Sequence, residues 1–377
     1  MINVFNKDAT DHLTAAIFFD PNGSTGIARY DKVKYTEIEH TIQKQLGFLW
    51  TPEEVDINKD RGDFSKLEPY KQHIFTSNLK RQILLDSVQG RAPTMVFGPI
   101  SGVPEMETWA TVWSFSEVIH SRSYSHIIRE VYAQSGLVFD EMSNIPEIIA
   151  CADDISHYYN DFLFYSSLYQ LFGYGKHTIN GVEYDVNEYD LKKKLWLCIM
   201  SVNILEGIRF YVSFACSWAF AENKLMEGNA KIIRFICRDE NLHLGMTQRL
   251  LRTILPGEDP IYAKIRQETR AECVAMFKSA INQEKEWAKY LFKDGTIIGL
   301  NETLLCKYID YIASHRLRAV GLPIDFEAPT RNPLPWTDSW ISSKSGQPAP
   351  QETEISSYIL GGMKQDVEKT TFSSFKL

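Results

Sequence analysis

The spacing of apolar positions predicts a mainly helical protein. From about Lys34 onward, hydrophobic residues recur every three to four positions, which is the period of an amphipathic α-helix. Prolines separate some of these stretches, and Pro256 and Pro260 mark a break late in the chain. We therefore expect an all-α fold with helices at residues 34–48, 67–89, 103–131, 150–172, 188–220, 222–252, 258–288 and 300–320.

One short segment departs from this period. Residues 177–184 alternate apolar and polar side chains around the pair Asn180-Gly181, which is a preferred sequence for a two-residue hairpin turn. We expect a small β-hairpin near residues 177–186, inserted between two helices.

The chain changes character near its C-terminus. Residues 342–377 are rich in Ser, Gly, Gln, Lys and Glu, which is typical of a flexible tail, so we divide the chain into a helical domain, 1–341, and a tail, 342–377. Tyr358 lies in an apolar island of this tail, and Phe375 and Leu377 close it with apolar side chains. The pattern favours a peptide that docks on a partner. A frayed terminus that contains aromatic residues is the simpler alternative.

The overall charge narrows the class of partner. The formal net charge is −8, the calculated pI is about 5.7, and basic runs are no longer than residues 192–194. Because nucleic-acid binding requires clustered Lys and Arg, we expect no nucleic-acid partner. The N-terminus lacks the apolar core of a signal peptide, and the most apolar stretch, 208–221, is short for a membrane span and contains Arg209. We expect a cytoplasmic protein with no membrane partner.

The cysteines are scattered and form no close pair in the sequence. Such spacing is typical of neither a disulfide framework nor a zinc site, so we expect buried, reduced thiols. They are Cys151, Cys198, Cys216, Cys237, Cys273 and Cys306.

The strongest chemical signal is a motif that occurs twice. Glu117 and His120 form one Glu-x-x-His pair, and Glu240 and His243 form another, each within a predicted helix. A separation of three residues places both side chains on one helix face, about 5–6 Å apart at Cβ. Two such motifs, with one more carboxylate from each of two other helices, are the ligand set of di-metal carboxylate bundles.

Asp86 and Glu206 could supply the two additional carboxylates. Each is an isolated acid within an apolar helical stretch, where an unpaired charge is costly unless a cation or hydrogen bonds compensate it. Taken singly, each feature favours an ordinary structural residue: Arg209 could pair with Glu206, and one Glu-x-x-His often occurs by chance. The combination of such groups on four predicted helices favours a metal site.

The types of ligand narrow the choice of metal. Four carboxylates and two imidazoles suit iron or manganese in a redox role better than structural zinc, which favours Cys and His. We expect two iron ions per chain, with manganese not excluded. The remaining histidines have no such motif, and we expect surface or core positions for His12, His40, His73, His126, His157, His177 and His315.

Tyr124 extends the ligand stripe of its helix. It follows His120 by four residues and Glu117 by seven, so its phenol is predicted to lie beside the metal pair. Apolar residues extend the helix faces that carry Glu206 and Glu240 in the same way. They could exclude water from an oxidised tyrosine. Ordinary core packing explains these residues equally well. They are Phe210, Phe214 and Ile236.

Four segments together resemble the small subunit of class I ribonucleotide reductases. They are LLDSVQGR at 84–91, residues 104–129 with SEVIHSRSYSHIIR, residues 192–222, and MEGNAKIIRFICRDENLHL at 226–244. The tyrosyl-radical type of the enterobacterial and phage branch is the most similar, and the likeness runs from about Phe18 to the C-terminus. The resemblance implies a ferritin-like helical bundle with additional helices, generally a homodimer.

The resemblance also implies roles for single residues. Tyr124 would carry the radical in a pocket formed by Phe210, Phe214 and Ile236. Asn241 stands where the family commonly has a small residue, and we interpret it as a spacer. The di-iron ligands would be Asp86, Glu117, His120, Glu206, Glu240 and His243.

A radical-transfer route is implied as well. Trp50, Asp239 and His120 would pass oxidising equivalents toward the surface. Tyr358 would hand them to the large catalytic subunit, on which the last residues of the tail would dock. In this scheme two ferrous ions reduce O2, Tyr124 loses an electron and a proton, and the large subunit reduces ribonucleotides to deoxyribonucleotides.

Two other functions use similar ligands. Another di-metal, O2-activating oxidase or hydroxylase would need the same six side chains, but not Tyr124, Trp50 and Tyr358 together. A ferritin-like iron-storage protein would leave the docking tail and the additional helices unexplained.

Overall fold

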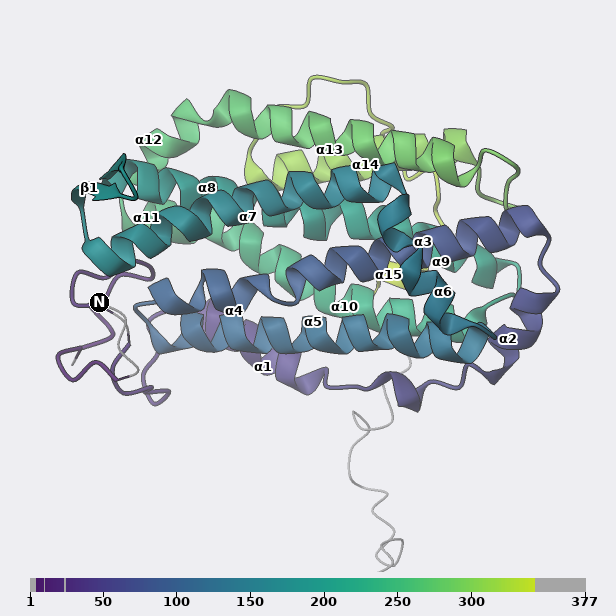
Figure 1. Cartoon of the computed structure of the whole chain (residues 1–377), viewed down its shortest axis with the longest axis horizontal. Helices are drawn as coiled ribbons and strands as arrows, with labels where there is room; N and C mark the ends of the chain where they lie inside the picture. The colour runs from purple at the N-terminus through teal and green to yellow at the C-terminus, as the bar shows by residue number, and fades with distance from the viewer. Residues whose placement is uncertain (1–4, 10, 24, 343–377) are drawn as a thin grey trace, which may run out of the picture.

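The computed structural model describes residues 5–9, 11–23 and 25–342, and this part of the chain is mainly helical (Figure 1). The α-helices are α1 Thr36–Gly47, α2 Asn58–Ser65, α3 Pro69–Gln89, α4 Ala92–Val96, α5 Pro104–Val131, α6 Ser135–Asp140, α7 Pro146–Phe172, α8 Glu188–Ile204, α9 Phe210–Glu222, α10 Glu227–Arg249, α11 Leu255–Glu258, α12 Ile261–Glu268, α13 Arg270–Leu291, α14 Glu302–Val320 and α15 Thr337–Ile341. Two π-helical turns, Leu205–Arg209 and Leu250–Ile254, join α8 to α9 and α10 to α11. Short 3-10 turns occupy Pro52–Glu54, Gly98–Ile100 and Met142–Asn144.

The long helices lie side by side in a layered bundle (Figure 1). Helix α3 packs against α5 and α9, and α10 packs against α9, α8 and α5. Helices α13 and α14 form an outer pair that covers α7, α8 and the first π-helical turn. The inner faces of α3, α5 and α10 therefore meet in the middle of the bundle, and the core there is completely buried.

Most predicted helices are confirmed, with two corrections. The helix expected at 258–288 is two helices, α12 and α13, which meet at Thr269. The prediction of a helix break at Pro256 is also wrong, because the helix continues through this proline to Glu258. The preceding π-helical turn widens the backbone spiral, which accommodates the proline ring and its missing N–H. The predicted break at Pro260 is confirmed, since this residue precedes α12.

The short helices α2, α4, α6 and α15 had no counterpart in the sequence prediction. Each spans eight residues or fewer, which is too little for a periodic apolar face to emerge. Contacts with the long helices decide whether such segments form.

The predicted hairpin is confirmed. Strands β1 Gly175–Ile179 and β2 Val182–Val186 pair antiparallel, with His177 opposite Tyr184. Asn180 and Gly181 both have positive φ angles, 51° and 81°. Positive φ at both central residues is what a tight hairpin turn requires, and it explains the Asn-Gly pair.

One long helix is apolar throughout. The segment Glu188–Glu222 is the one helix among the described residues that is long and apolar enough to cross a membrane, and its most apolar window is completely buried inside the protein. The apolar stretch 208–221 is therefore the second half of the helical segment that the sequence predicted at 188–220. Its burial by neighbouring helices identifies it as the centre of the core.

All six cysteines are free, and five of them are buried while Cys306 is half-buried. The expectation of buried thiols without a disulfide partner is thus met at five positions, while Cys306 is only half-buried. The predicted tail residues Tyr358, Phe375 and Leu377 lie outside the described residues, as does nearly all of 342–377.

Candidate metal centre

Four separate segments of the bundle bring the six predicted ligands together. Asp86 comes from α3, Glu117 and His120 from α5, Glu206 from the π-helical turn, and Glu240 and His243 from α10. All six side chains are buried, with at most 1% of their surface exposed. Sequence spacing placed each pair on one helix face, and the packing of α3, α5 and α10 makes these faces converge.

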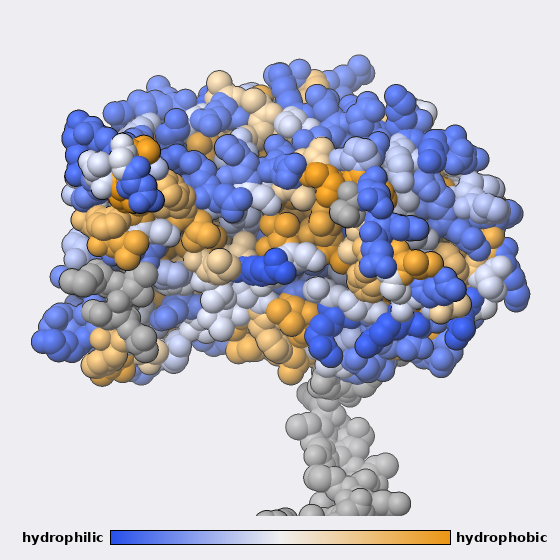
Figure 2. Space-filling model, in the orientation of Figure 1, coloured by the Kyte–Doolittle hydropathy of each residue, from blue (hydrophilic) through white to orange (hydrophobic). Residues whose placement is uncertain are grey.

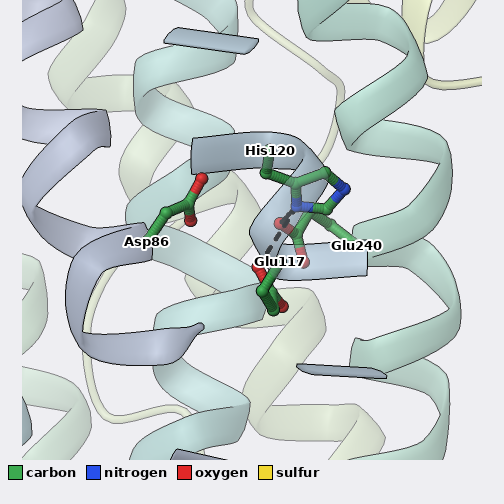
Figure 3. A group of neighbouring side chains, drawn as sticks. All are labelled: Asp86, Glu117, His120 and Glu240. Carbon is green, nitrogen blue, oxygen red and sulfur yellow. Dashed lines mark hydrogen bonds and ion pairs between the residues drawn. The ribbon is translucent and has the colours of Figure 1, made fainter. Parts of the chain in front are cut away.

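The six residues form two overlapping groups that could each hold a metal ion. Asp86 and His120 define the first metal position (Figure 3), and Glu206 and His243 define the second. Glu117 and Glu240 belong to both groups, and in each group the ligand atoms lie within 4.8 Å of one another. Two shared carboxylates between two positions are the arrangement of a bridged di-metal site.

Both imidazoles turn the same nitrogen toward the carboxylates. His120 Nδ1 lies 3.1 Å from Glu117 Oε2 and 3.1 Å from Glu240 Oε1. His243 Nδ1 lies 2.8 Å from Glu240 Oε2 and 3.0 Å from Glu117 Oε1. The Nδ1 atoms are therefore the ones that face the two metal positions.

Several oxygens of the site have no hydrogen-bond donor among the described residues. Both carboxylate oxygens of Asp86 and the Oε2 atom of Glu206 are buried without a hydrogen-bond partner. Leaving such atoms unpaired costs several kcal/mol, roughly, unless a cation compensates them. Four buried carboxylates beside two imidazoles therefore fit a pair of divalent cations.

The structure excludes the simpler explanation for Glu206. Arg209, which the sequence offered as its partner, instead binds Asp154 at 2.6 Å and Gln283 at 2.8 Å, and lies 3.5 Å from Glu284. Glu206 and Arg209, three positions apart in the π-helical turn, thus point to different sides of the bundle, and Glu206 points to the metal positions.

The pKa values of the ligands show that their buried charges are unfavourable without cations. Burial, followed by the charge of Glu117, raises the pKa of Asp86 well above its usual value, and burial with the charge of Glu240 does the same for Glu206. Burial opposes a charge on His243, but the Glu117 and Glu240 carboxylates outweigh it and raise its pKa to about 9. The metal-free site therefore retains protons that metal ions would displace.

Asp239 and Trp50 extend the first metal position outward, as the resemblance implied. His120 Nε2 lies 3.1 Å from Asp239 Oδ2, and Trp50 Nε1 donates to the same oxygen at 2.9 Å. A carboxylate behind a ligating histidine fixes the orientation of its ring. The three residues are thus in contact, and their role in transfer stays a prediction.

Three residues that contact the ligands, and a fourth that contacts one of these three, were missed by sequence reasoning. Trp113 Nε1 donates to Glu117 Oε1 at 2.9 Å, and Ser116 Oγ lies 3.0 Å from His243 Nε2. Gln89 Nε2 donates to Glu206 Oε1 at 2.7 Å.

Tyr159, on α7, donates in turn to Gln89 Oε1 at 2.6 Å. Trp113 and Gln89 lie one helical turn from the ligands Glu117 and Asp86, a spacing that could have indicated them. The sequence pattern did not indicate Tyr159, because only the packing of helices brings α7 to the site.

Tyr124 lies beside the first metal position. Its side chain is completely buried, and its hydroxyl is close enough to Asp86 to interact with that carboxylate, although it has no hydrogen bond within the distance and angle limits. Burial, with the charge of Asp86, raises the pKa of Tyr124 well above its usual value, so the phenol keeps its proton. Phe210, Phe214 and Ile236 are also completely buried, and the two phenylalanine rings stack with centroids 5.9 Å apart.

Asn241 is more than the spacer that the sequence suggested. Its side-chain oxygen accepts a hydrogen bond from the Tyr211 hydroxyl, which ties α10 to α9 next to Glu240. The interpretation as a spacer is therefore corrected.

Comparisons with known proteins agree with this geometry. Residues 28–333 match the protein family described as ribonucleotide reductase, small chain. The chain is 50% identical over 374 residues to the ribonucleoside-diphosphate reductase 1 subunit beta of Salmonella typhimurium, covering 99% of both chains. It is 42% identical over 387 residues to the ribonucleoside-diphosphate reductase subunit beta of Enterobacteria phage T4, covering 100% of this chain and 99% of the phage protein.

A solved structure supports the fold. The ribonucleotide reductase R2 subunit from Clostridium botulinum superposes with a TM-score of 0.76 at 22% identity, covering 90% of this chain and 98% of that one. The predicted ferritin-like helical bundle with a small hairpin is thereby confirmed. On these matches, the chain belongs to the ribonucleotide reductase small-chain family.

Proposed function

We propose that this reductase small subunit binds two iron ions at the six buried ligands and uses them to oxidise Tyr124 to a stable radical. The observation that carries the proposal is the pair of overlapping ligand groups with a completely buried tyrosine beside one of them. The oxidising equivalent is then relayed to the large subunit that a small subunit of this family serves. There, ribonucleotides are reduced to deoxyribonucleotides.

The donor set supports iron. Four carboxylates and two imidazoles, without a thiolate, suit iron, with manganese as the alternative of similar ligand preference. When bound, two ferrous ions would supply two of the electrons that convert O2 to water, Tyr124 would supply a third, and an external one-electron reductant would supply the fourth.

The protein's own residues orient the ions and protect the tyrosine. Glu117 and Glu240 would be shared by the two ions, while Asp86 would offer an oxygen acceptor for the phenolic proton of Tyr124. The completely buried rings of Phe210 and Phe214 are proposed to line the tyrosine pocket. Exclusion of water and reductants would then give the radical its lifetime.

The buried chain from His120 through Asp239 to Trp50 is proposed as the first part of the transfer route. The second part would run through Tyr358 in the tail, 342–377, which would dock on the large subunit through Phe375 and Leu377. These tail residues lie outside the described residues, so their role is inferred from the sequence pattern alone. The division into a helical domain, 1–341, and this tail is part of the same proposal.

We also propose that the chain acts as a cytoplasmic homodimer. Phe115 and Val118 leave about half of their side chains exposed one turn apart on α5, and Met95 on α4 does the same. Figure 2 shows patches of apolar residues across the middle of the visible face of the molecule. Apolar side chains of this kind are suited to a contact between subunits. The six free cysteines agree with a reducing compartment.

A low-temperature EPR spectrum of the apo-protein loaded with Fe(II) and exposed to O2 tests the proposal. We expect an organic-radical signal from the wild type and none from Tyr124→Phe, with equal iron uptake by both. Iron uptake and O2 consumption without a radical would instead identify a di-metal oxidase. Incorporation of many irons per chain would indicate storage, and the comparisons support neither alternative.

A further inference from the structure

We infer that Arg316 on α14 is a positioning residue for the second metal position. By holding the π-helical turn Leu205–Arg209, it fixes Glu206, although it is not itself a ligand. The inference rests on the proposed two-metal site and deepens it, because it names a support for one half of that site.

The π-helical turn is an uncommon backbone conformation. It is rare, occurs mostly as a single turn within α-helices, and is frequent at functional sites. Here the turn interrupts a long buried helix at the residue that must reach the metal ions, Glu206. The position of this carboxylate therefore depends on whether the turn keeps its wide geometry or relaxes to an α-helix.

Arg316 makes two contacts with this region. Its Nε donates a hydrogen bond of 3.0 Å to the carbonyl oxygen of Gly207, the residue next to Glu206. Its guanidinium lies over the ring of Tyr211, 4.7 Å from the ring centroid. One side chain of α14 thus holds the backbone of the turn and the first turn of α9 together.

The close approach of Arg316 is favoured by glycine at position 207. A Cβ atom there would lie 2.9 Å from Leu244 Cδ1 and 3.2 Å from Arg316 Cδ. Both distances are shorter than ordinary van der Waals contact. The missing side chain of Gly207 is therefore what allows α14 to reach the backbone beside a ligand.

The contact continues to α10. The Tyr211 hydroxyl donates to Asn241, which follows the shared ligand Glu240. On the other side of the turn, Arg209 is bound to Asp154 and Gln283, which lie on α7 and α13. None of these contacts involves Asp86 or His120, so the loss of Arg316 should affect the second metal position much more than the first.

Manganese binding tests this selectivity without using enzyme activity. Apo-protein is titrated with MnCl2, bound ions are counted by equilibrium dialysis, and the EPR spectrum distinguishes an isolated Mn(II) ion from a coupled pair. The wild type is expected to bind two ions as a coupled pair. Arg316→Met, which keeps much of the aliphatic stem, should bind the first ion normally and the second roughly 10-fold or more weakly.

Two further variants control for folding. Arg316→Lys keeps a hydrogen-bond donor and a positive charge, so it should bind the second ion more tightly than Arg316→Met does. Arg318→Met makes the same change at an exposed position two residues away and should behave as the wild type. Hydrogen exchange in residues 205–211 should become faster in Arg316→Met alone.

The possible outcomes separate the two proposals. Equal weakening of both ions in Arg316→Met, or unchanged binding of both, would overturn the positioning role while the two-metal site stands. If Arg316→Met fails to fold, Arg316→Lys and Gly207→Ala test the positioning role instead. Each of these variants must then lower the affinity for the second ion selectively. Absence of a bound pair in the wild type would refute the proposed metal site itself.

Discussion

Trp50 and Asp239 are 189 positions apart in the chain, yet Trp50 Nε1 donates a hydrogen bond of 2.9 Å to Asp239 Oδ2. The same oxygen lies 3.1 Å from His120 Nε2, and the Trp50 and His120 rings lie 28° from parallel with centroids 6.3 Å apart. All three side chains are buried. A continuous, buried chain of contacts therefore runs from the first metal position to an indole ring, which is an oxidisable group.

Replacing this indole should separate radical formation from turnover. Trp50→Phe removes the N–H donor and the more easily oxidised ring, but no ligand. We expect nearly normal metal uptake and Tyr124 radical formation, and turnover with the large subunit reduced on the order of 100-fold or more, which corresponds to about 2.7 kcal/mol. EPR and a nucleotide-reduction assay measure the two quantities. Trp196→Phe, an equally buried indole that packs on Tyr262, is the control, and full turnover by Trp50→Phe would exclude the route.

Metal uptake should depend on pH through His243. The pKa of its imidazole is raised from 6.5 to about 9 in the folded, metal-free protein, whereas a bound ion requires the neutral ring. Because the folded pKa is raised, this charge stabilises the apo-protein fully below pH 6.5, and the contribution is lost as the pH rises through 9.

We therefore expect Mn(II) affinity to increase between pH 6.5 and 9, by up to about tenfold per unit for this proton. Titration calorimetry in buffers of different ionisation enthalpy counts the protons released. The exposed His157, as His157→Gln, should leave the profile unchanged. Binding without proton release, at an affinity that does not vary with pH, would contradict the predicted protonation of the site.

Glu284 should be important for stability, since it is completely buried between Arg81 and Arg209. Removing the charge in Glu284→Gln leaves two buried guanidinium groups undercompensated, which should lower the free energy of unfolding by roughly 3–5 kcal/mol. Urea denaturation followed by circular dichroism gives the value. Glu286→Gln makes the same change at an exposed position on α13 and should cost less than about 0.5 kcal/mol. Equal losses in both variants would contradict this account.

Gln89 should control how Glu206 binds its ion. Gln89→Leu removes the donor to Glu206 Oε1, which should weaken the second metal position roughly 10- to 100-fold. Tyr159→Phe removes only the hydrogen bond to Gln89, worth about 1 kcal/mol, and should have a smaller effect. Competition with a chelator measures the affinity, and Tyr158→Phe on the same helix is the control. A larger effect for Tyr159→Phe than for Gln89→Leu would show that this order is wrong.

Local spacing explains most of what could be predicted. Glu117, His120 and Tyr124 share one helix face because the helical period alone puts them there, and the same holds for Glu240 and His243. The Asn180-Gly181 turn is equally local, because it depends on the φ angles of two adjacent residues. These features are set within a few residues of one another, so the sequence carries them directly.

The errors arose where the backbone responds to its surroundings. Helix continues through Pro256 because a π-helical turn precedes it, and a single predicted helix at 258–288 divides at Thr269. Arg209 could reach Glu206 by spacing, but packing gives it Asp154 and Gln283 instead. Neither the periodicity nor the composition of the chain predicts these backbone conformations and side-chain partners.

The sequence by itself therefore determined the helical class, the six candidate ligands and the tyrosine beside them. Only the tertiary structure decided that Glu117 and Glu240 are shared between two metal positions, and that Tyr159 and Arg316 support Glu206. The reason is physical: a helix fixes the direction of its own side chains, whereas contacts between distant segments depend on how whole helices pack.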